Sequence, residues 1–486
     1  MSSRRRWIIV WVLACLPLMG WWLYGLFDVD EGFYGAVVAE MNRRGEWITP
    51  YYNGKAWFEK PILLYWLAKP CLALFGDMIG PRLPSILTTL GTYGAVAWFA
   101  NRRLGATVAQ LSVLFLASSL LVVGTGRMML TDLPLLLSLT AAMLTFWESL
   151  VGRPSYRVWT AAWLGIGVLS KGPVALILFA IIAGWTYWRE KELRPAFRGY
   201  WVHGTVVVVL IIGSWYIPAY LVNGQVFVQK FLVEQNIGRF TGGDAAHTLG
   251  GVQSLVLYVP ILFLGMFPWS VYLWKAWPRR SPRPNEATES CLEEGQLVRY
   301  LASWAAVIFI FFTISGAKLP HYILPVIPPL AILVAVDVVK RTPDPKKWFY
   351  AAGVTCLMMT VVANAVFLWW YGASGQKEVH AIVRYVRNEG GAVAIYQMGR
   401  RNKDLGTGKL KLQETSLPSL LMYLDSTAID TDDFNEILRT KAPVWIVTRE
   451  GRIVPADFRA AQRAGRVLSA VKSPMPQDNY RLYQVK

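Results

Sequence analysis

Hydrophobic residues gather in long runs separated by short polar segments, and this pattern predicts membrane-spanning helices. A helix needs about 20 mostly apolar residues to cross a bilayer. The candidate spans are residues 7–27, 81–100, 107–124, 132–149, 158–170, 172–188, 201–222, 252–274, 299–316, 320–339 and 348–371. The pattern therefore predicts an α-helical polytopic membrane protein with about 11 spans.

The basic residues predict the orientation of these spans. If Arg4 to Arg6 and the N-terminus lie in the cytoplasm, alternation places every strongly basic loop there, such as the one with Arg102 and Arg103. Residues 61–76 are apolar but short and are interrupted by a Lys-Pro pair. A crossing there would turn the later basic loops outward, so we expect this segment to lie in the interface or to re-enter.

Two polar segments on the outward side are unusual for translocated loops. The first, residues 28–80, opens with Asp30 and Glu31, is rich in aromatic residues and contains Phe-Glu-Lys-Pro at 58–61. Charged groups held beside hydrocarbon are costly, so a function is the first hypothesis; an amphipathic surface helix with two capping acids is the alternative. The second, residues 223–251, begins with aromatics on one helical face and becomes glycine-rich.

The composition changes after Tyr371. Residues 375–486 are charged and contain no span. Helices are predicted at 376–389, 432–440 and 455–465, and strands at 392–397, 443–448 and 479–485. We therefore divide the chain into a transmembrane domain, residues 1–374, and a small soluble α/β domain, residues 375–486, which the predicted topology places outside the cytoplasm.

Composition supports the membrane assignment and narrows the partners. Hydrophobic residues make up 54% of the chain and charged residues 16%, below the quarter typical of soluble proteins. The net charge of +18 comes from short loops facing membrane lipid, which argues against nucleic acid as the partner. The four cysteines are scattered without a CxxC pair, so neither a disulfide framework nor a thiolate metal site is indicated.

Several motifs together resemble the bacterial lipid-A aminoarabinose transferases. They are Asp30-Glu31, Gly45 to Pro50, Phe58 to Pro61, Thr131-Asp132, Ser170 to Gly172, Arg239-Phe240, and Lys318 to Pro325. These enzymes belong to the GT-C glycosyltransferases that use polyprenyl-phosphate sugars, a group that includes protein mannosyltransferases. The resemblance covers roughly residues 1–370.

The resemblance implies roles for the acids. Asp30 would be the general base that takes the proton of the acceptor, with Glu31 beside it, because sugar transfer needs a carboxylate to orient an acceptor oxygen. Asp132 would be a second acid in the same cavity. Its alternative is to start the helix ahead of Leu133-Pro134.

The resemblance also implies a cationic site for the departing lipid phosphate. Lys60, Arg239 and Tyr322 would contact the phosphate. The alternative for Lys60 is a lysine that snorkels at the end of a span, for Arg239 a solvated loop charge, and for Tyr322 an interfacial anchor. Lys171 and Lys318 would help to bind the anionic donor or would only mark the ends of spans. The resemblance establishes no cofactor but leaves a divalent metal cation open, with Glu59 and His247 as the candidate ligands and His321 as another outward histidine.

These features predict an integral-membrane glycosyltransferase of the bacterial inner membrane. It would move a sugar from an undecaprenyl-phosphate donor to lipid A or another envelope acceptor on the periplasmic side. A protein O-glycosyltransferase using a polyprenyl-phosphate mannose is an alternative. A flippase for a lipid-linked sugar and a scaffold protein are alternatives of another kind, but no internal repeat supports a transporter.

Overall fold

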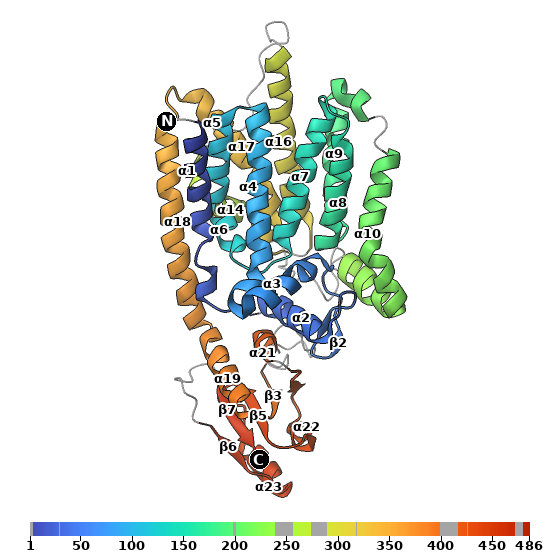
Figure 1. The fold of residues 1–486 in the computed structure, drawn as a ribbon, viewed down its shortest axis with the longest axis vertical. Coiled ribbons are helices and arrows are strands. Elements are labelled where there is room, and N and C mark those ends of the chain that lie inside the picture. Colours follow the sequence, from blue (N-terminus) through green and yellow to red (C-terminus); the bar gives the residue numbers. More distant parts are fainter. Residues whose placement is uncertain are drawn as a thin grey trace. The chain divides into compact units, whose positions relative to one another are not determined.

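The computed structural model describes residues 3–28, 30–197, 201–238, 256–273, 289–316, 318–398, 417–424, 426–471 and 480–486 (Figure 1). Contacts divide the chain into two compact units. The first unit comprises Met1–Gly20, Phe58–Leu64 and Pro84–Ala363, and the second comprises Trp21–Trp57, Tyr65–Leu83 and Asn364–Lys486. The C-terminal tail therefore groups with much of the first polar segment.

The first unit is a bundle of helices. Its longer helices are α1 (Ser3–Cys15), α4 (Leu83–Arg103), α5 (Ala106–Ala117), α7 (Asp132–Leu150), α8 (Tyr156–Lys171), α9 (Val174–Arg189), α10 (Trp201–Asn223), α16 (Glu289–Ile314), α17 (Ile327–Arg341) and α18 (Lys346–Ala373). Shorter elements are η1 (Leu16–Leu18), α6 (Leu120–Gly126), η4 (Lys191–Phe197), α11 (Gln225–Phe227), η5 (Val228–Gly238), α14 (Tyr258–Gly265), η6 (Trp269–Tyr272) and η8 (Pro320–Val326). Helices α5, α7 and α17 are buried along most of their length and form the centre.

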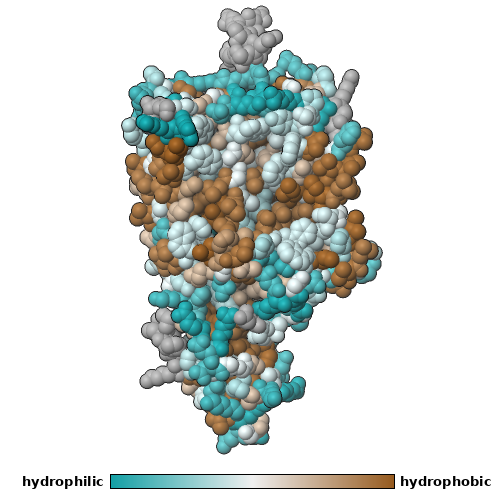
Figure 2. Space-filling model, viewed as in Figure 1, coloured by the Kyte–Doolittle hydropathy of each residue, from teal (hydrophilic) through white to brown (hydrophobic). Residues whose placement is uncertain are grey.

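The polytopic α-helical class is confirmed. Within the described residues, seven helices are long and apolar enough to cross a membrane, or eight if α5 and α6, bent by 62°, count as one broken span. The prediction was about eleven. The difference arises largely because α8 and α9 have 16 residues each, or about 24 Å of helix against about 30 Å of hydrocarbon. In Figure 2 hydrophobic residues form a belt across this bundle, below a hydrophilic end.

The segment predicted not to cross, residues 61–76, lies in helix α3 (Leu63–Ile79). The helix is broken at Gly76, whose φ of 71° favours glycine, and a 3-10 turn, η3 (Gly80–Arg82), separates it from α4. A side chain at Gly80 would lie 2.5 Å from the backbone of Leu72, so the close return of the chain requires glycine. Together α3 and α4 count as one candidate span, and the interfacial placement of α3 stays a prediction.

The second unit begins with the 3-10 turn η2 (Trp21–Leu23), followed by helix α2 (Asp30–Arg44) and a two-stranded hairpin, β1 (Tyr51–Tyr52) and β2 (Lys55–Ala56). Asn53 and Gly54 both have positive φ, as a tight hairpin turn requires.

The tail adds a five-stranded sheet. Its strands are β3 (Ala392–Tyr396), β4 (Ile429–Thr431), β5 (Val444–Thr448), β6 (Leu468–Ala470) and β7 (Arg481–Val485), in the order β4-β3-β5-β7-β6. Strands β4, β3 and β5 are parallel, and β7 is antiparallel to both neighbours. The helices are α19 (Gln376–Glu389), α21 (Pro418–Tyr423), α22 (Phe434–Arg439) and α23 (Pro455–Arg463).

The predicted helices and strands of the tail are all present, with small shifts at their ends. One face of the sheet packs Ala394 and Tyr396 against Phe434 and Ile437 of α22. Strands β3 and β5 are buried on both faces, so their sequences are short apolar runs without polar alternation. The predicted boundary at 374 between a membrane and a soluble domain stays a prediction.

Candidate functional site

An ion pair in the first unit joins two of the motifs. Asp132, the first residue of α7, binds the ammonium of Lys171, the last residue of α8. Gly172 ends α8 with a φ of 83°, and the hydroxyl of Ser170 donates to the carbonyl of Thr131 at 2.8 Å. The end of α8 is thus fastened to the start of α7, where an acid is favoured by the helix dipole. Asp132 is a first-turn residue rather than the N-cap.

The Lys318 to Pro325 motif contributes two rings to this ion pair. His321 places Nε2 3.7 Å from the second oxygen of Asp132, and the ring of Tyr322 lies 3.9 Å from the ammonium of Lys171. Both residues lie in the 3-10 segment η8, where Pro320 and Pro325 cannot donate backbone hydrogen bonds. The rigid turn therefore presents neighbouring rings to the same ion pair.

Lys60 adds a second cation. Its charge interacts electrostatically with Asp132, and its own segment is anchored because Phe58 is buried with its ring 5.3 Å from that of Phe227. Asp132, Lys171, His321 and Tyr322 contact one another, and Lys60 lies within electrostatic range of Asp132; we call these five residues the Asp132 cluster. Two lysines, a histidine and one carboxylate give the Asp132 cluster a net positive charge.

Lys318 serves a different contact. Its ammonium donates to the carbonyl of Phe312 at 3.3 Å and to that of Thr313, near the C-terminal end of α16. A cation is favoured there because the last carbonyls of a helix carry partial negative charge. Its ammonium also lies 5.5 Å from the ring of Tyr258. The alternative that Lys318 marks the end of a span fits these contacts.

The second polar segment, residues 223–251, is described only in part. Phe227 and Phe231 stack at 5.3 Å and are both buried against Trp215, as the amphipathic pattern predicted. Arg239 and His247 lie outside the described residues. Among the residues that the structure does describe, no group of three or more histidine, cysteine or acidic side chains converges as a metal site, and Glu59 belongs to none.

The two acids at the start of α2 belong to the second unit. Asp30 is the first residue of the helix and is partly exposed. Glu31 is fully buried, and Arg82 holds both of its oxygens, with Nε to Oε1 at 2.8 Å and Nη2 to Oε2 at 2.7 Å. The same guanidinium donates to the carbonyls of Tyr24 and Gly25, both at 2.7 Å. Arg82 therefore fixes the chain that leads into Asp30.

The tail fastens the same helix start. The carboxylate of Asp28 accepts hydrogen bonds from the backbone N–H of Ser419 at 2.8 Å, from its hydroxyl at 2.6 Å, and from Gln376 at 2.9 Å. Burial raises the pKa of Asp28 to about 6 in spite of these donors. Gly32 lets the helix approach, since a Cβ there would lie 2.7 Å from the Ser419 nitrogen.

Comparison with known proteins agrees with the fold and the motifs. The profile of the dolichyl-phosphate-mannose-protein mannosyltransferase family matches residues 59–217. An undecaprenyl phosphate-α-4-amino-4-deoxy-L-arabinose arabinosyl transferase of Pseudomonas fluorescens is 31% identical over 70% of this chain and 59% of its own length. The enzyme of the same name from Edwardsiella ictaluri is 30% identical over 71% of this chain and 61% of its own.

A solved structure extends the likeness over the whole chain. ArnT from Cupriavidus metallidurans bound to undecaprenyl phosphate aligns with 100% of this chain and 98% of its own, at 19% identity and a TM-score of 0.77. The chain has the GT-C fold and is a relative of the aminoarabinose transferases. The resemblance read from the motifs is thereby confirmed. The aligned part spans about 60% of the curated relatives' length.

Sequence reasoning missed two residues, His321 of the Asp132 cluster and Arg82, the partner of Glu31. His321 was considered only as a metal ligand, although it lies directly beside Tyr322 in its motif. Arg82 was placed inside a predicted span, where a buried arginine is costly without a partner. Its position directly after Gly80-Pro81 was the available signal, since a charge at the start of an apolar run needs a partner or a route to water.

Proposed function

We propose that this protein is a membrane glycosyltransferase that moves a sugar from a polyprenyl-phosphate donor to lipid A or another envelope acceptor. The observation that carries the proposal is the Asp132 cluster, a net positive group in which four half-buried residues surround the buried Asp132, where α7, α8 and η8 meet. Its residues come from the motifs by which the sequence resembles the aminoarabinose transferases, and the names of two similar proteins include undecaprenyl phosphate. Cations there would neutralise the departing lipid phosphate.

Each residue of the cluster has a chemical role in this proposal. Lys60 and Lys171 contact phosphate oxygens, and Tyr322 orients Lys171 from the face of its ring. Asp132 holds Lys171 and His321 in place, which prevents the cations from repelling one another. Arg239 would add a planar fork for phosphate. Lys318 supports the end of α16 instead.

We assign the acceptor side to Asp30. The hydroxyl of the acceptor attacks the anomeric carbon of the sugar and its proton passes to the Asp30 carboxylate, while the bond to the phosphate oxygen breaks and the lipid phosphate leaves with the electron pair. Glu31 is a positioning residue, because its carboxylate is bound by Arg82. With Arg4 to Arg6 in the cytoplasm, the reaction side is the periplasmic one.

The Asp30→Asn variant tests this assignment. Loss of the base should lower turnover by about a hundredfold or more while donor affinity changes little, because the amide keeps the shape of the side chain. Transfer is measured with radiolabelled undecaprenyl-phosphate sugar and extracted envelope lipid. Unchanged turnover would overturn the role of Asp30, and no transfer by the folded wild-type protein to any envelope fraction would overturn the enzyme.

A protein acceptor is the second candidate, since the matched profile is that of protein mannosyltransferases. Labelling of envelope proteins rather than lipid in the same assay would favour it. A flippase would move lipid-linked sugar without transferring it, and Asp30→Asn should then leave its rate unchanged.

A further inference from the structure

A cavity of about 950 Å³ lies among helices α7, α8, α9 and α10 of the first unit. Its lining is mostly apolar and includes Phe146, Leu164, Phe179, Ala180, Ala183 and Val208, which we call its apolar depth. Cavities of this size and character hold molecules as large as a cofactor or part of a lipid. Nothing in the proposed transfer reaction occupies this space.

One end of the cavity, which we call its mouth, is cationic. Arg157, Lys191 and Arg194 line it, and Lys191 is exposed. Arg194 donates to the carbonyls of Tyr187 at 3.0 Å and Trp188 at 3.2 Å, and carbonyl partners orient a guanidinium without neutralising its charge. The neighbouring carboxylate of Glu190 is held by Arg299, with both bonds at 2.8 Å.

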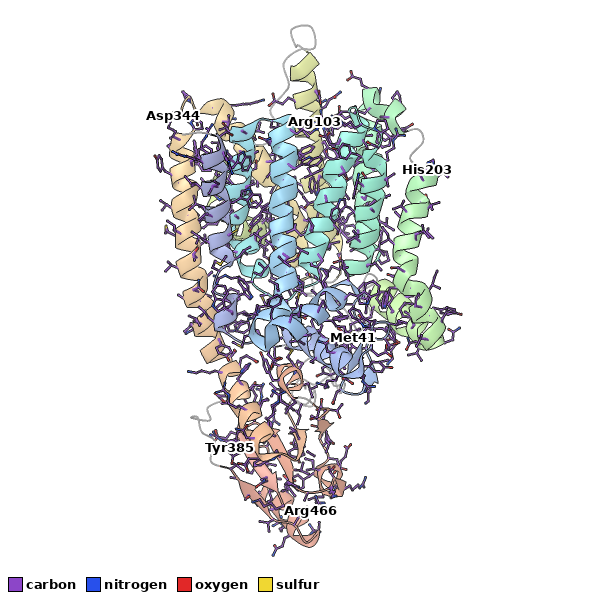
Figure 3. The ribbon with its side chains drawn as sticks, in the orientation of Figure 1. Met41, Arg103, His203, Asp344, Tyr385 and Arg466 are labelled. Carbon is purple, nitrogen blue, oxygen red and sulfur yellow. The ribbon has the colours of Figure 1, made fainter. Side chains whose placement is uncertain are left out.

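The cavity lies at the other end of the bundle from the Asp132 cluster. Arg157 lies in the first turn of α8 and Lys171 ends the helix, so about 21 Å of helix separates them. Arg103 and His203, which adjoins the cavity residue Gly204, lie at this same end of the bundle in Figure 3. It is the end with the basic loops.

Exposed tryptophans mark the depth of this end in a membrane. Trp159 of α8 and Trp185 and Trp188 of α9 are 59%, 42% and 64% exposed. Tryptophan is enriched where hydrocarbon meets lipid headgroups. The mouth of the cavity therefore opens at headgroup level, while its apolar depth runs alongside the acyl chains.

We propose that this cavity binds an anionic membrane phospholipid. One acyl chain lies in the apolar depth between α8, α9 and α10, and the phosphate meets Arg157, Lys191 and Arg194. Basic pockets between helices on the cytoplasmic side suit such headgroups. A soluble phosphate would leave the apolar wall unused, and a neutral lipid would present no net negative charge to this cationic end.

The lipid would add contacts to a helix at the edge of the bundle. Helix α10 packs on α8, but only Trp215 and Ala219 of its described side chains are buried, and it contributes Gly204, Thr205 and Val208 to the cavity. It continues through α11 into η5, the start of the second polar segment. Occupancy should therefore raise the thermal stability of the protein, because a ligand that binds only the folded state stabilises it.

The test uses the full-length protein in neutral detergent with dioleoylphosphatidylglycerol, dioleoylphosphatidylcholine or glycerol 3-phosphate. Native mass spectrometry should show the anionic lipid retained and the other two not, and the anionic lipid alone should raise the melting temperature. The variant Lys191→Gln/Arg194→Gln should weaken retention by about tenfold or more. The control Lys346→Gln/Lys347→Gln removes two exposed charges from the start of α18 and should leave retention unchanged.

A second variant tests the apolar depth. Gly184 lines the cavity, and a Cβ there would meet nothing within 4 Å, so Gly184→Leu fills the space without a clash and favours the helix. It should abolish retention in a folded protein. The proposal is overturned if the protein retains both lipids equally, or if the two double variants lower retention equally. It is also overturned if glycerol 3-phosphate fully displaces the anionic lipid, or if Gly184→Leu retains that lipid as well as the wild type does.

Discussion

Replacing Arg82 with methionine should destabilise the second unit more than any surface substitution. The change leaves the carboxylate of Glu31 buried without its cation, and it removes the donors that hold the carbonyls of Trp21, Tyr24 and Gly25. Breaking a buried ion pair from one side costs about 3–5 kcal/mol, because the remaining charge stays out of water. Both side chains of this pair have no exposed surface, so the full penalty applies.

The assay is thermal unfolding of the full-length protein in neutral detergent, followed by intrinsic fluorescence. For a unit of this size, about 3–5 kcal/mol corresponds to a fall in melting temperature of roughly 10 °C. The matched control is Arg341→Met, which breaks an ion pair with Asp337 whose arginine is 49% exposed. Such pairs contribute less than about 1 kcal/mol, so this variant should melt near the wild type.

A double variant separates the ion pair from simple loss of packing. Glu31→Leu/Arg82→Met removes both charges and should recover part of the stability lost in Arg82→Met, because no buried charge is then left unpaired. Equal melting temperatures for Arg82→Met and its surface control would refute the reasoning. So would a double variant less stable than the single one.

Two further predictions concern the same unit. Gly32→Ala should lower the free energy of unfolding by about 1–3 kcal/mol, because its Cβ would lie 2.0 Å from an Asp28 oxygen. The control Gly94→Ala in α4, whose Cβ would meet nothing within 4 Å, should be neutral or stabilising, and chemical denaturation compares the two. Burial, aided by the charge of Arg384, lowers the pKa of His380 to about 4, so the folded state favours the neutral imidazole. The stability that this preference gives above pH 6.5 is lost as the pH falls toward 4, because the unfolded state then binds a proton that the folded state does not. Relative to His380→Gln, the wild type should lose about 2 kcal/mol between pH 7 and 4.5, and parallel pH profiles of the two proteins would contradict this.

The fold could be predicted where local pattern decides structure. Apolar runs gave the long helices because a bilayer demands about 20 such residues, and α19 followed from Val379, Ile382, Val383 and Val386 on one face. Strands β4 and β6 were not predicted, because three residues are too few to show alternation.

The site could be predicted as a set of residues but not as an arrangement. Motifs nominated Lys60, Asp132, Lys171 and Tyr322, yet only tertiary structure brings the ends of α7, α8 and η8 together. Glu31 shows the limit most clearly, because its partner Arg82 lies 51 residues away in the sequence. Nothing in the sequence near Glu31 shows whether it forms a buried ion pair or acts as a catalytic acid beside Asp30.

The central claim is that the Asp132 cluster binds the phosphate of the donor lipid. Its most direct test is the affinity of undecaprenyl phosphate for the full-length protein in lipid nanodiscs, measured in a Gly184→Leu background so that the cavity at the other end cannot contribute. The Lys60→Gln/Lys171→Gln variant should bind at least about tenfold more weakly than its parent, and Lys346→Gln/Lys347→Gln should bind equally well. Undiminished binding by the Lys60→Gln/Lys171→Gln variant would contradict the account.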